Sequence, residues 1–247
     1  MTIKAISFDF WHTLFTEQPD LTKLYHSRRR SLLEEAVLTR RTVPRAELER
    51  ACKVEAECHQ KIWKEEHRTL HVAERLSAIL GELNVALPEV ALAGLTRVFE
   101  EGVLEHPPVL IEGAREVLTQ LSERYRLAII SDVGFSPGRV LKQVLASNGL
   151  LELFDSLVFS DEAGRAKPHK KVFETTARSL RVQPRDIVHI GDLERSDIAG
   201  AKLAGYRAIR FTGVTRMAEG EPTMADFVTG DLTEIPRLVE MLDGGLE

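Results

Sequence analysis

The chain has 247 residues, of which 43% are hydrophobic and 29% charged, and its formal net charge is −5. These proportions are typical of a globular protein that buries a sizeable core. The small negative charge argues against nucleic-acid binding, which needs a basic surface, and the absence of a run of about 18 apolar residues argues against a membrane span.

The chain enters a strand-like run almost at once, without an apolar segment and a small-residue cleavage site, so we expect no signal peptide. Cys52 and Cys58 are six residues apart on a predicted helix and do not share a face, so we expect no disulfide between them. Both features predict a cytoplasmic protein.

The first element is a short apolar run at residues 4–10, which predicts a buried strand that ends near an acid. From about residue 21 to residue 104 the pattern is helical throughout, with breaks at 42–44, 66–67 and 84–88. We expect one helix from Leu21 to about Val37 and three more at 45–65, 69–83 and 88–104.

After the prolines at 107–108 the pattern alternates. It predicts helices at 113–124, 137–147, 169–180 and 195–204, and strands at 126–131, 156–160, 186–191 and 206–211. Alternation of this kind predicts an α/β fold with a doubly wound, Rossmann-like parallel sheet. The first strand therefore belongs with the second half of the chain. Residues 1–16 and 106–247 would form the core, and residues 17–105 an inserted helical cap domain.

Polar residues follow four of the predicted elements of the core. They are Asp9, the pair Ser131-Asp132, Lys167, and the pair Gly191-Asp192. In an open parallel sheet the ligand crevice lies outside the carboxyl ends of the strands. An acid, a hydroxyl, a cation and a second acid at that edge predict a site for an anion together with a metal ion.

The same segments resemble the four signatures of the haloacid dehalogenase-like superfamily, in the same order. Residues 9–14, DFWHTL, resemble the first signature, D-x-D-G-T-L, and Ser131 resembles the second. Lys167 within GRAKP resembles the third, and residues 191–197, GDLERSD, resemble the fourth, G-D-x-x-x-x-D. The helical insertion is similar to the all-helical cap of one branch of that superfamily.

The resemblance implies a covalent mechanism of phosphoryl transfer. Asp9 would be the nucleophile that forms an aspartyl-phosphate. Ser131 and Lys167 would hold the phosphoryl oxygens and stabilise developing negative charge. Thr13 and Asp132 are further candidates for substrate binding; Thr13 would use its hydroxyl or its backbone N–H, or would only fix the loop.

The resemblance also implies a Mg²⁺ site built from hard oxygen ligands. Carried over to this sequence, the ligands are the Asp9 carboxylate, the backbone carbonyl of Trp11 and the Asp192 carboxylate. Asp197 would be a more distant ligand, through water, or would orient Lys167. It also stands in the first turn of a predicted helix, where the helix dipole favours an acid.

Two residues of the first signature depart from the family pattern. Trp11 stands where phosphatases of the family carry a second aspartate that protonates the leaving group and later activates water. An indole N–H cannot do either. His12 replaces the usual glycine, and its imidazole would be a substitute acid and base or simply a histidine of a surface loop.

The departure at Trp11 leaves other functions open. The family's dehalogenases carry an aromatic residue, Tyr, at this place, but they lack the Gly-Asp pair of the fourth signature. The phosphonate-cleaving branch uses a cap lysine, for which Lys23, Lys53, Lys61 and Lys64 are available. A weakly active relative that only binds a phosphorylated ligand is a further alternative. We expect a Mg²⁺-dependent phosphatase acting on a small phosphorylated metabolite, as a monomer or homodimer without nucleic-acid or membrane partners.

The predicted cap contains one arginine that interrupts an apolar stripe. Arg28 would either point toward the crevice and meet the far end of an anionic substrate, or lie at the edge of the stripe with its charge in water; we favour the second. Arg29 and Arg30 are expected to be solvated, and Trp63 and Phe99 to be core residues.

Overall fold

The computed structural model describes residues 2–218 and 220–244 and contains a six-stranded parallel sheet. The strand order is β5-β4-β1-β6-β7-β8. The strands are β1 (Ala5–Phe8), β4 (Arg126–Ser131), β5 (Ser156–Phe159), β6 (Ile187–Gly191), β7 (Arg207–Phe211) and β8 (Phe227–Thr229). The first strand of the chain lies in the middle of the sheet, which confirms the predicted doubly wound α/β fold.

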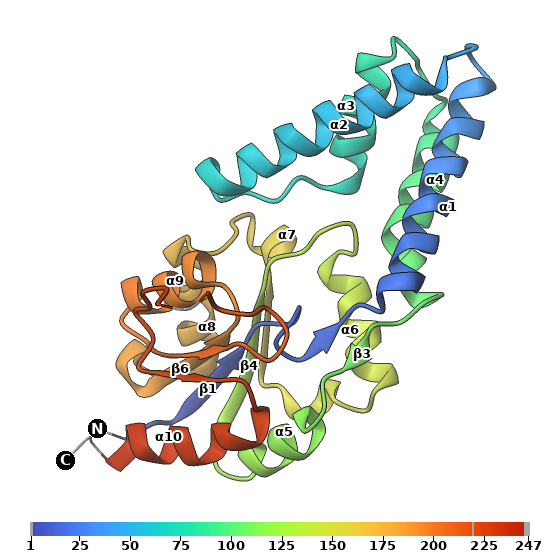
Figure 1. The fold of residues 1–247 in the computed structure, drawn as a ribbon. Coiled ribbons are helices and arrows are strands. Elements are labelled where there is room, and N and C mark those ends of the chain that lie inside the picture. Colours follow the sequence, from blue (N-terminus) through green and yellow to red (C-terminus); the bar gives the residue numbers. More distant parts are fainter. Residues whose placement is uncertain (1, 219, 245–247) are drawn as a thin grey trace.

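Helices cover both faces of this sheet (Figure 1). One face packs against α5 (Ala114–Ser122), α6 (Gly138–Ser147) and α10 (Ile235–Gly244), and the other against α8 (Lys170–Leu180) and α9 (Ala199–Leu203). Successive strand residues point to opposite faces of the sheet. Ile6 and Phe8 therefore pack in the hydrophobic cluster under α5, α6 and α10, and Ala5 packs in the cluster under α8 and α9. Shorter turns connect them: α7 (Ser160–Ala163) and the 3₁₀ segments Leu151–Leu153, Pro184–Asp186 and Leu232–Glu234.

The predicted helical stretch forms α1 (Pro19–Leu38), α2 (Arg45–Lys61), α3 (Val72–Glu82) and α4 (Glu89–Glu101). α1 and α4 run side by side away from the sheet, and α2 and α3 pack together and extend back over the edge of the sheet (Figure 1). These helices share a hydrophobic cluster of their own, which includes Leu33, Leu76 and Phe99. Phe99 is therefore a core residue as expected.

Some elements differ from those predicted. α2 is followed by a π-helical turn (Ile62–Glu66), α4 by a 3₁₀ turn (Gly102–Leu104), and α9 is preceded by another π-helical turn (Glu194–Ile198). The chain passes from the sheet to the helices α1–α4 at β2 (Phe15–Thr16) and returns at β3 (Val109–Leu110). These two strands pair as a short antiparallel ribbon. β2, β3 and β8 were not predicted, because two or three residues carry too little periodicity to indicate a strand. The ten-residue helix α10 was not predicted either.

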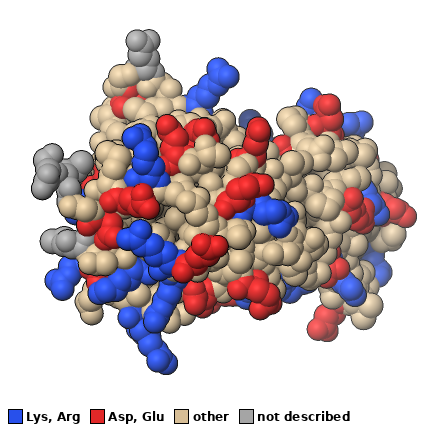
Figure 2. Space-filling model, turned by 90° about the horizontal axis from the view of Figure 1, so that it is seen from below, with Lys and Arg blue, Asp and Glu red and all other residues tan. Residues whose placement is uncertain are grey.

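Charged residues of both signs are interspersed on the face seen from below (Figure 2). At the amino-terminal side of the sheet, Lys4 pairs with Asp186 at 2.7 Å and Arg124 with Asp243 at 3.1 Å. In each pair the basic side chain is exposed and the acidic partner is largely buried. Among the described residues, no helix has both the length and the apolar character needed to cross a membrane.

Candidate active site

The sheet order brings three of the predicted polar segments to one point. Phe8 of β1 is paired with Ile129 of β4 and with Ile190 of β6, so the residues that follow these strands meet at the same edge. Asp9 comes directly after β1, and its backbone N–H donates to the Ile190 carbonyl at 2.8 Å. In the sheet, β4 and β5 lie on one side of β1, and β6, β7 and β8 lie on the other. α/β sheets bind ligands at the point where the strand order reverses in this way.

Lys167 supplies the positive charge at this edge. Its ammonium lies 2.7 Å from Asp9 Oδ1, 2.5 Å from Asp197 Oδ1 and 3.0 Å from the Ile130 carbonyl oxygen, so all three of its donors are used. The side chain is almost wholly buried. Burial alone would lower the pKa of Lys167, but the Asp197 and Asp9 carboxylates outweigh it and hold that pKa above its usual value.

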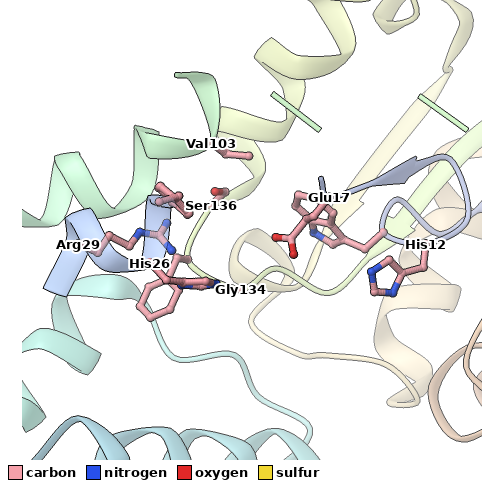
Figure 3. Close-up of a pocket in the computed structure, with 10 residues that line it drawn as sticks. His12, Glu17, His26, Arg29, Val103, Gly134 and Ser136 are labelled. Atoms are coloured by element: carbon pink, nitrogen blue, oxygen red, sulfur yellow. The ribbon is translucent and has the colours of Figure 1, made fainter. Parts of the chain in front are cut away.

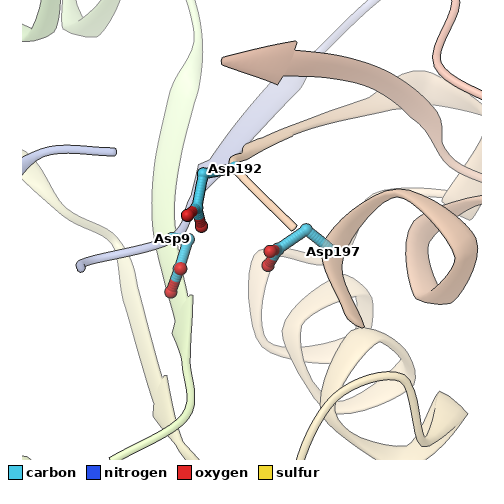
Figure 4. A group of neighbouring side chains, drawn as sticks. All are labelled: Asp9, Asp192 and Asp197. Atoms are coloured by element: carbon cyan, nitrogen blue, oxygen red, sulfur yellow. The ribbon is translucent and has the colours of Figure 1, made fainter. Parts of the chain in front are cut away.

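Three buried carboxylates lie together at this edge, and two of them, Asp9 and Asp197, contact the Lys167 ammonium. One carboxylate oxygen from each of Asp9, Asp192 and Asp197 lies within 4.8 Å of the other two, so that the three could bind one metal ion (Figure 4). Burial raises the pKa of Asp9 to about 8, and the carboxylates of Asp197 and Asp192 add to the effect against the opposing charge of Lys167. Burial likewise raises the pKa of Asp192. An excess of buried negative charge with hard oxygen donors fits a divalent cation such as Mg²⁺.

Asp197 has little capacity left for a metal ion. Oδ1 accepts from Lys167 and lies 3.3 Å from His189 Nε2, while Oδ2 accepts from the Leu193 N–H and the Ser196 hydroxyl. Although burial opposes it, Lys167 and His189 hold the pKa of Asp197 below its usual value. These contacts favour the orienting role toward Lys167 over direct ligation.

Glycine at position 191 follows from this crowding. A Cβ on Gly191 would lie 2.5 Å from Cβ and Cγ of Asp197, closer than packed atoms allow. The glycine of the Gly191-Asp192 pair therefore lets the segment 193–197 fold back under the strand end, where Asp197 reaches Lys167.

Asp192 has partners that the sequence did not indicate. The Thr215 hydroxyl donates to Oδ2 at 2.5 Å, and His12 Nδ1 lies 3.8 Å from the same oxygen. Thr215 comes from the loop after β7, and no motif marks it, because its position depends on how that loop returns over the sheet edge. The proximity of His12 places an imidazole beside the acid cluster.

The Asp9–Leu14 loop explains the usual glycine at position 12. His12 has φ of 57°, in the left-handed region that costs a non-glycine residue about 1–2 kcal/mol.

The Trp11 ring is half-buried and meets the Phe10 ring edge-on, with centroids 5.0 Å apart. Thr13 is fully buried and its hydroxyl has no hydrogen-bond partner, so its contact with a phosphoryl oxygen stays a prediction.

Ser131 and Asp132 lie at the end of β4, where they were expected. Ser131 is buried, and its hydroxyl donates weakly to the Asp132 carbonyl at 3.2 Å, an interaction that a better acceptor would replace. Asp132 does not face open solvent: Oδ1 accepts from the Lys167 backbone N–H at 2.8 Å. Asp132 therefore holds the backbone of the Lys167 loop.

The second partner of Asp132 is Trp63 from the helical segment. Trp63 Nε1 donates to Asp132 Oδ2 at 2.7 Å, and the Arg195 guanidinium lies 4.2 Å from the centre of the indole ring. The expectation that Trp63 is a core residue is wrong. The signal that could have indicated this contact is the indole N–H, which needs a partner when it is buried.

A cavity of about 240 Å³ lies between the first helix and the loop after β4, and His12, which is 3.8 Å from Asp192, is among its lining residues. His12 borders it on one side and Arg29 and His26 on the other, with Glu17 between them (Figure 3), and Trp11 also lines it. Its remaining lining residues are Tyr25, Val103, Gly134, Phe135 and Ser136.

The cavity corrects one expectation about the arginines of α1. Arg28 is exposed and forms an ion pair with Glu105, in agreement with the favoured alternative. Arg29, expected to be solvated, is only 5% exposed and lines the cavity. Sequence reasoning missed it because the two residues are neighbours and differ only in the helix face to which they point.

Comparison with known proteins identifies the family and the fold. A model of the haloacid dehalogenase-like hydrolases matches residues 3–205. A glyceraldehyde 3-phosphate phosphatase from Pyrococcus furiosus is 31% identical over 134 residues, which are 54% of this chain and 54% of that protein. The match thus spans about half the length of that curated relative.

Solved structures share the architecture over almost the whole chain. A 2-haloacid dehalogenase from Pseudomonas syringae has a TM-score of 0.72 at 21% identity and covers 97% of this chain and 99% of its own. A hydrolase from Bacillus subtilis, bound to magnesium, has a TM-score of 0.63 at 20% identity with the same coverage. At this level of identity the likeness concerns the fold alone.

Proposed function

Because this chain belongs to the haloacid dehalogenase-like hydrolases, we propose that it is a Mg²⁺-dependent phosphatase in which Asp9 attacks a small phosphorylated substrate. The observation that carries the proposal is the buried cluster of Asp9, Asp192 and Asp197 around the Lys167 ammonium. A cation and an excess of carboxylates at a strand edge suit a phosphate dianion bound together with a metal ion.

In the first step a carboxylate oxygen of Asp9 forms a bond to phosphorus while the bond from phosphorus to the leaving-group oxygen breaks. The electron pair of that bond goes to the leaving group, which needs a proton when it is a poor one. Lys167 and the Ser131 hydroxyl stabilise the charge on the phosphoryl oxygens. In the second step water attacks phosphorus and releases Asp9 and inorganic phosphate.

The residues present fit a magnesium ion. The Asp9 and Asp192 carboxylates would hold it with the Trp11 carbonyl, and Asp197 would fix Lys167 beside it. When bound, the ion neutralises charge on the phosphate and on the carboxylates. Burial and, to a smaller extent, the neighbouring carboxylates raise the pKa of Asp9, so a bound cation would favour the ionised nucleophile.

We further propose that residues 17–105 form a cap domain that opens and closes over the site. The separate hydrophobic cluster of α1–α4 supports the division. Three contacts would hold the closed form: Trp63 with Asp132, the His67 carbonyl with the Ala166 N–H at 2.7 Å, and Thr69 with Ser160 at 2.7 Å. All three reach the loops that carry the site, so closure would also position Lys167.

The test is hydrolysis of p-nitrophenyl phosphate and a panel of phosphomonoesters, with Mg²⁺ and with EDTA. We expect turnover that requires Mg²⁺ and that Asp9→Asn abolishes without a change in the folded state. Asp161→Asn is the matched control, since Asp161 is an acid of the core outside the cluster that accepts from the Gly138 N–H. Wild-type activity in Asp9→Asn would refute the nucleophile, and chloride release from 2-chloropropionate would instead indicate a dehalogenase.

A further inference from the structure

Two buried arginines of the helical segment stack on the same aromatic ring, but only one has a counter-ion. The guanidinium carbons of Arg29 and Arg75 lie 4.3 Å and 3.7 Å from the centre of the Phe135 ring. Arg75 forms a bidentate pair with Glu55, at 2.6 Å and 3.1 Å. No carboxylate among the described residues lies within 4.0 Å of the Arg29 guanidinium.

Arg29 is held in place without being neutralised. Its guanidinium lies 3.5 Å from the centre of the Tyr25 ring, and Nη2 donates to the Phe99 carbonyl. Nε is buried and has no hydrogen-bond partner among residues 2–218 and 220–244. Burial, helped by the nearby charge of Arg75, lowers the pKa of Arg29 to about 9, so the side chain is still cationic at neutral pH.

The group therefore combines the properties of an anion-binding site. A buried cation gains much from a hydrogen-bonded anion, because its desolvation is otherwise uncompensated. Aromatic stacking fixes the planar fork, which reduces the entropy lost on binding. Arg29 lines the same cavity as Trp11 and His12, which lie two and three residues after Asp9 in the chain.

We propose that this cavity binds the leaving group of the substrate and that Arg29 recognises an oxyanion, a carboxylate or a second phosphate, at its far end. The proposal rests on the proposed function and narrows the substrate class to phosphomonoesters with a second anionic group. The mostly apolar walls formed by Trp11, Tyr25 and Phe135 suit a carbon skeleton between the two anions.

Glu17 lines the same cavity, and its removal should affect the binding of an anionic leaving group in the opposite direction to removal of Arg29. It is exposed, and its carboxylate is turned toward the space between Arg29 and His12 (Figure 3). Its negative charge raises the pKa of Arg29 but would repel a bound oxyanion. Removal of Arg29 and removal of Glu17 should therefore change the preference for anionic leaving groups in opposite directions.

The experiment compares aryl phosphates whose leaving groups differ in charge but little in reactivity. 4-Carboxyphenyl phosphate and 1,4-phenylene bisphosphate carry the second anion, and 4-carbamoylphenyl phosphate is the neutral control. We expect kcat/KM for at least one anionic substrate to exceed that of the carbamoyl ester by about tenfold or more. Whether the carboxylate or the bisphosphate is preferred identifies the oxyanion.

Arg29→Met should remove this preference, Arg29→Lys should retain part of it, and Glu17→Gln should increase it. Arg28→Met is the matched control, one residue earlier on the same helix but exposed, and should leave the preference unchanged. Thermal unfolding shows whether each variant is folded; if Arg29→Met is not, Arg29→Lys and Glu17→Gln decide. Equal kcat/KM for charged and neutral substrates, or a preference that survives in Arg29→Met, would overturn the proposal.

A binding measurement separates failure of this inference from failure of the proposed function. Calorimetry with 4-carboxybenzylphosphonate, its carbamoyl counterpart and 1,4-phenylenebis(methylphosphonate) needs no turnover. Tighter binding of either second-anion analogue in the wild type, lost in Arg29→Met, would support the oxyanion site even if no ester is hydrolysed. Equal binding of all three would overturn it even if Asp9-dependent phosphatase activity is found.

Discussion

Lys167 is the residue on which the charge balance of the site depends most directly, and its replacement by Met tests that balance. Its ammonium is buried between Asp9 and Asp197, at 2.7 Å and 2.5 Å. Methionine has a similar length and no charge, so the substitution removes the cation without leaving a large cavity. Burial raises the pKa of Asp9, whereas Lys167 and His189 hold the pKa of Asp197 below its usual value, so Asp197 is the carboxylate whose charge depends most on Lys167.

The size of the effect follows from the burial of this pair. Removal of one partner of a buried ion pair typically costs 3–5 kcal/mol. Uptake of a proton by Asp197 limits the cost, since protonating a carboxyl group with an ordinary pKa of 3.8 requires about 4 kcal/mol at pH 7. We therefore expect Lys167→Met to lower the free energy of unfolding by about 3–4 kcal/mol at pH 7 in EDTA.

The effect should also depend on pH in a defined direction. In the wild type the pKa of Asp197 is held below 3.8, so its pairing contributes stability that is present above this value and lost as the pH falls below it. In Lys167→Met the pKa of Asp197 in the folded state rises above 3.8. The penalty should then decrease by up to about 1.4 kcal/mol for each pH unit between pH 7 and pH 4.

The assay is urea unfolding of both proteins at several pH values in EDTA. Lys170→Met is the matched control, because Lys170 is exposed and only forms a pair with Glu174 at 3.4 Å; it should change stability by less than about 1 kcal/mol. If Lys167→Met were as stable as Lys170→Met at pH 7, or if its penalty grew toward acid pH, the assignment of Lys167 as the essential counter-ion would be refuted.

Three further substitutions test the loops around the site. Trp11→Asp should raise kcat/KM for alkyl phosphates by roughly 10²–10⁴-fold by supplying a general acid, with a smaller effect on p-nitrophenyl phosphate; wild-type turnover of alkyl esters as fast as aryl esters would contradict this. His12→Gly should stabilise the protein by up to about 1 kcal/mol by relieving the positive φ, measured by urea unfolding; an accompanying loss of alkyl phosphatase activity would show that His12 transfers the proton. Trp63→Phe leaves Asp132 Oδ2 without its donor and should lower kcat/KM by roughly 5- to 100-fold, with faster hydrogen exchange at residues 62–69; unchanged exchange would argue against a role in closure.

Much of the α/β core could be predicted because each local pattern agreed with the final structure. A buried parallel strand needs a continuous apolar run, and the first polar residue after it marks its carboxyl end, so the positions of Asp9, Ser131 and Asp192 followed from the sequence. The departures at Trp11 and His12 were visible for the same reason, since they stand in a recognisable pattern next to Asp9.

Residues whose role depends on contacts between distant segments could not be predicted. Arg28 and Arg29 are about 100° apart around the helix, and an interrupted stripe does not show which of them faces the interior. Trp63 meets Asp132 only because the helical segment folds back over the sheet edge, and Thr215 meets Asp192 only because a loop returns there. The strand ends were therefore determined by the sequence itself, whereas the tertiary structure decided which side chains of the remaining chain surround them, since local periodicity contains no information on contacts between segments so far apart.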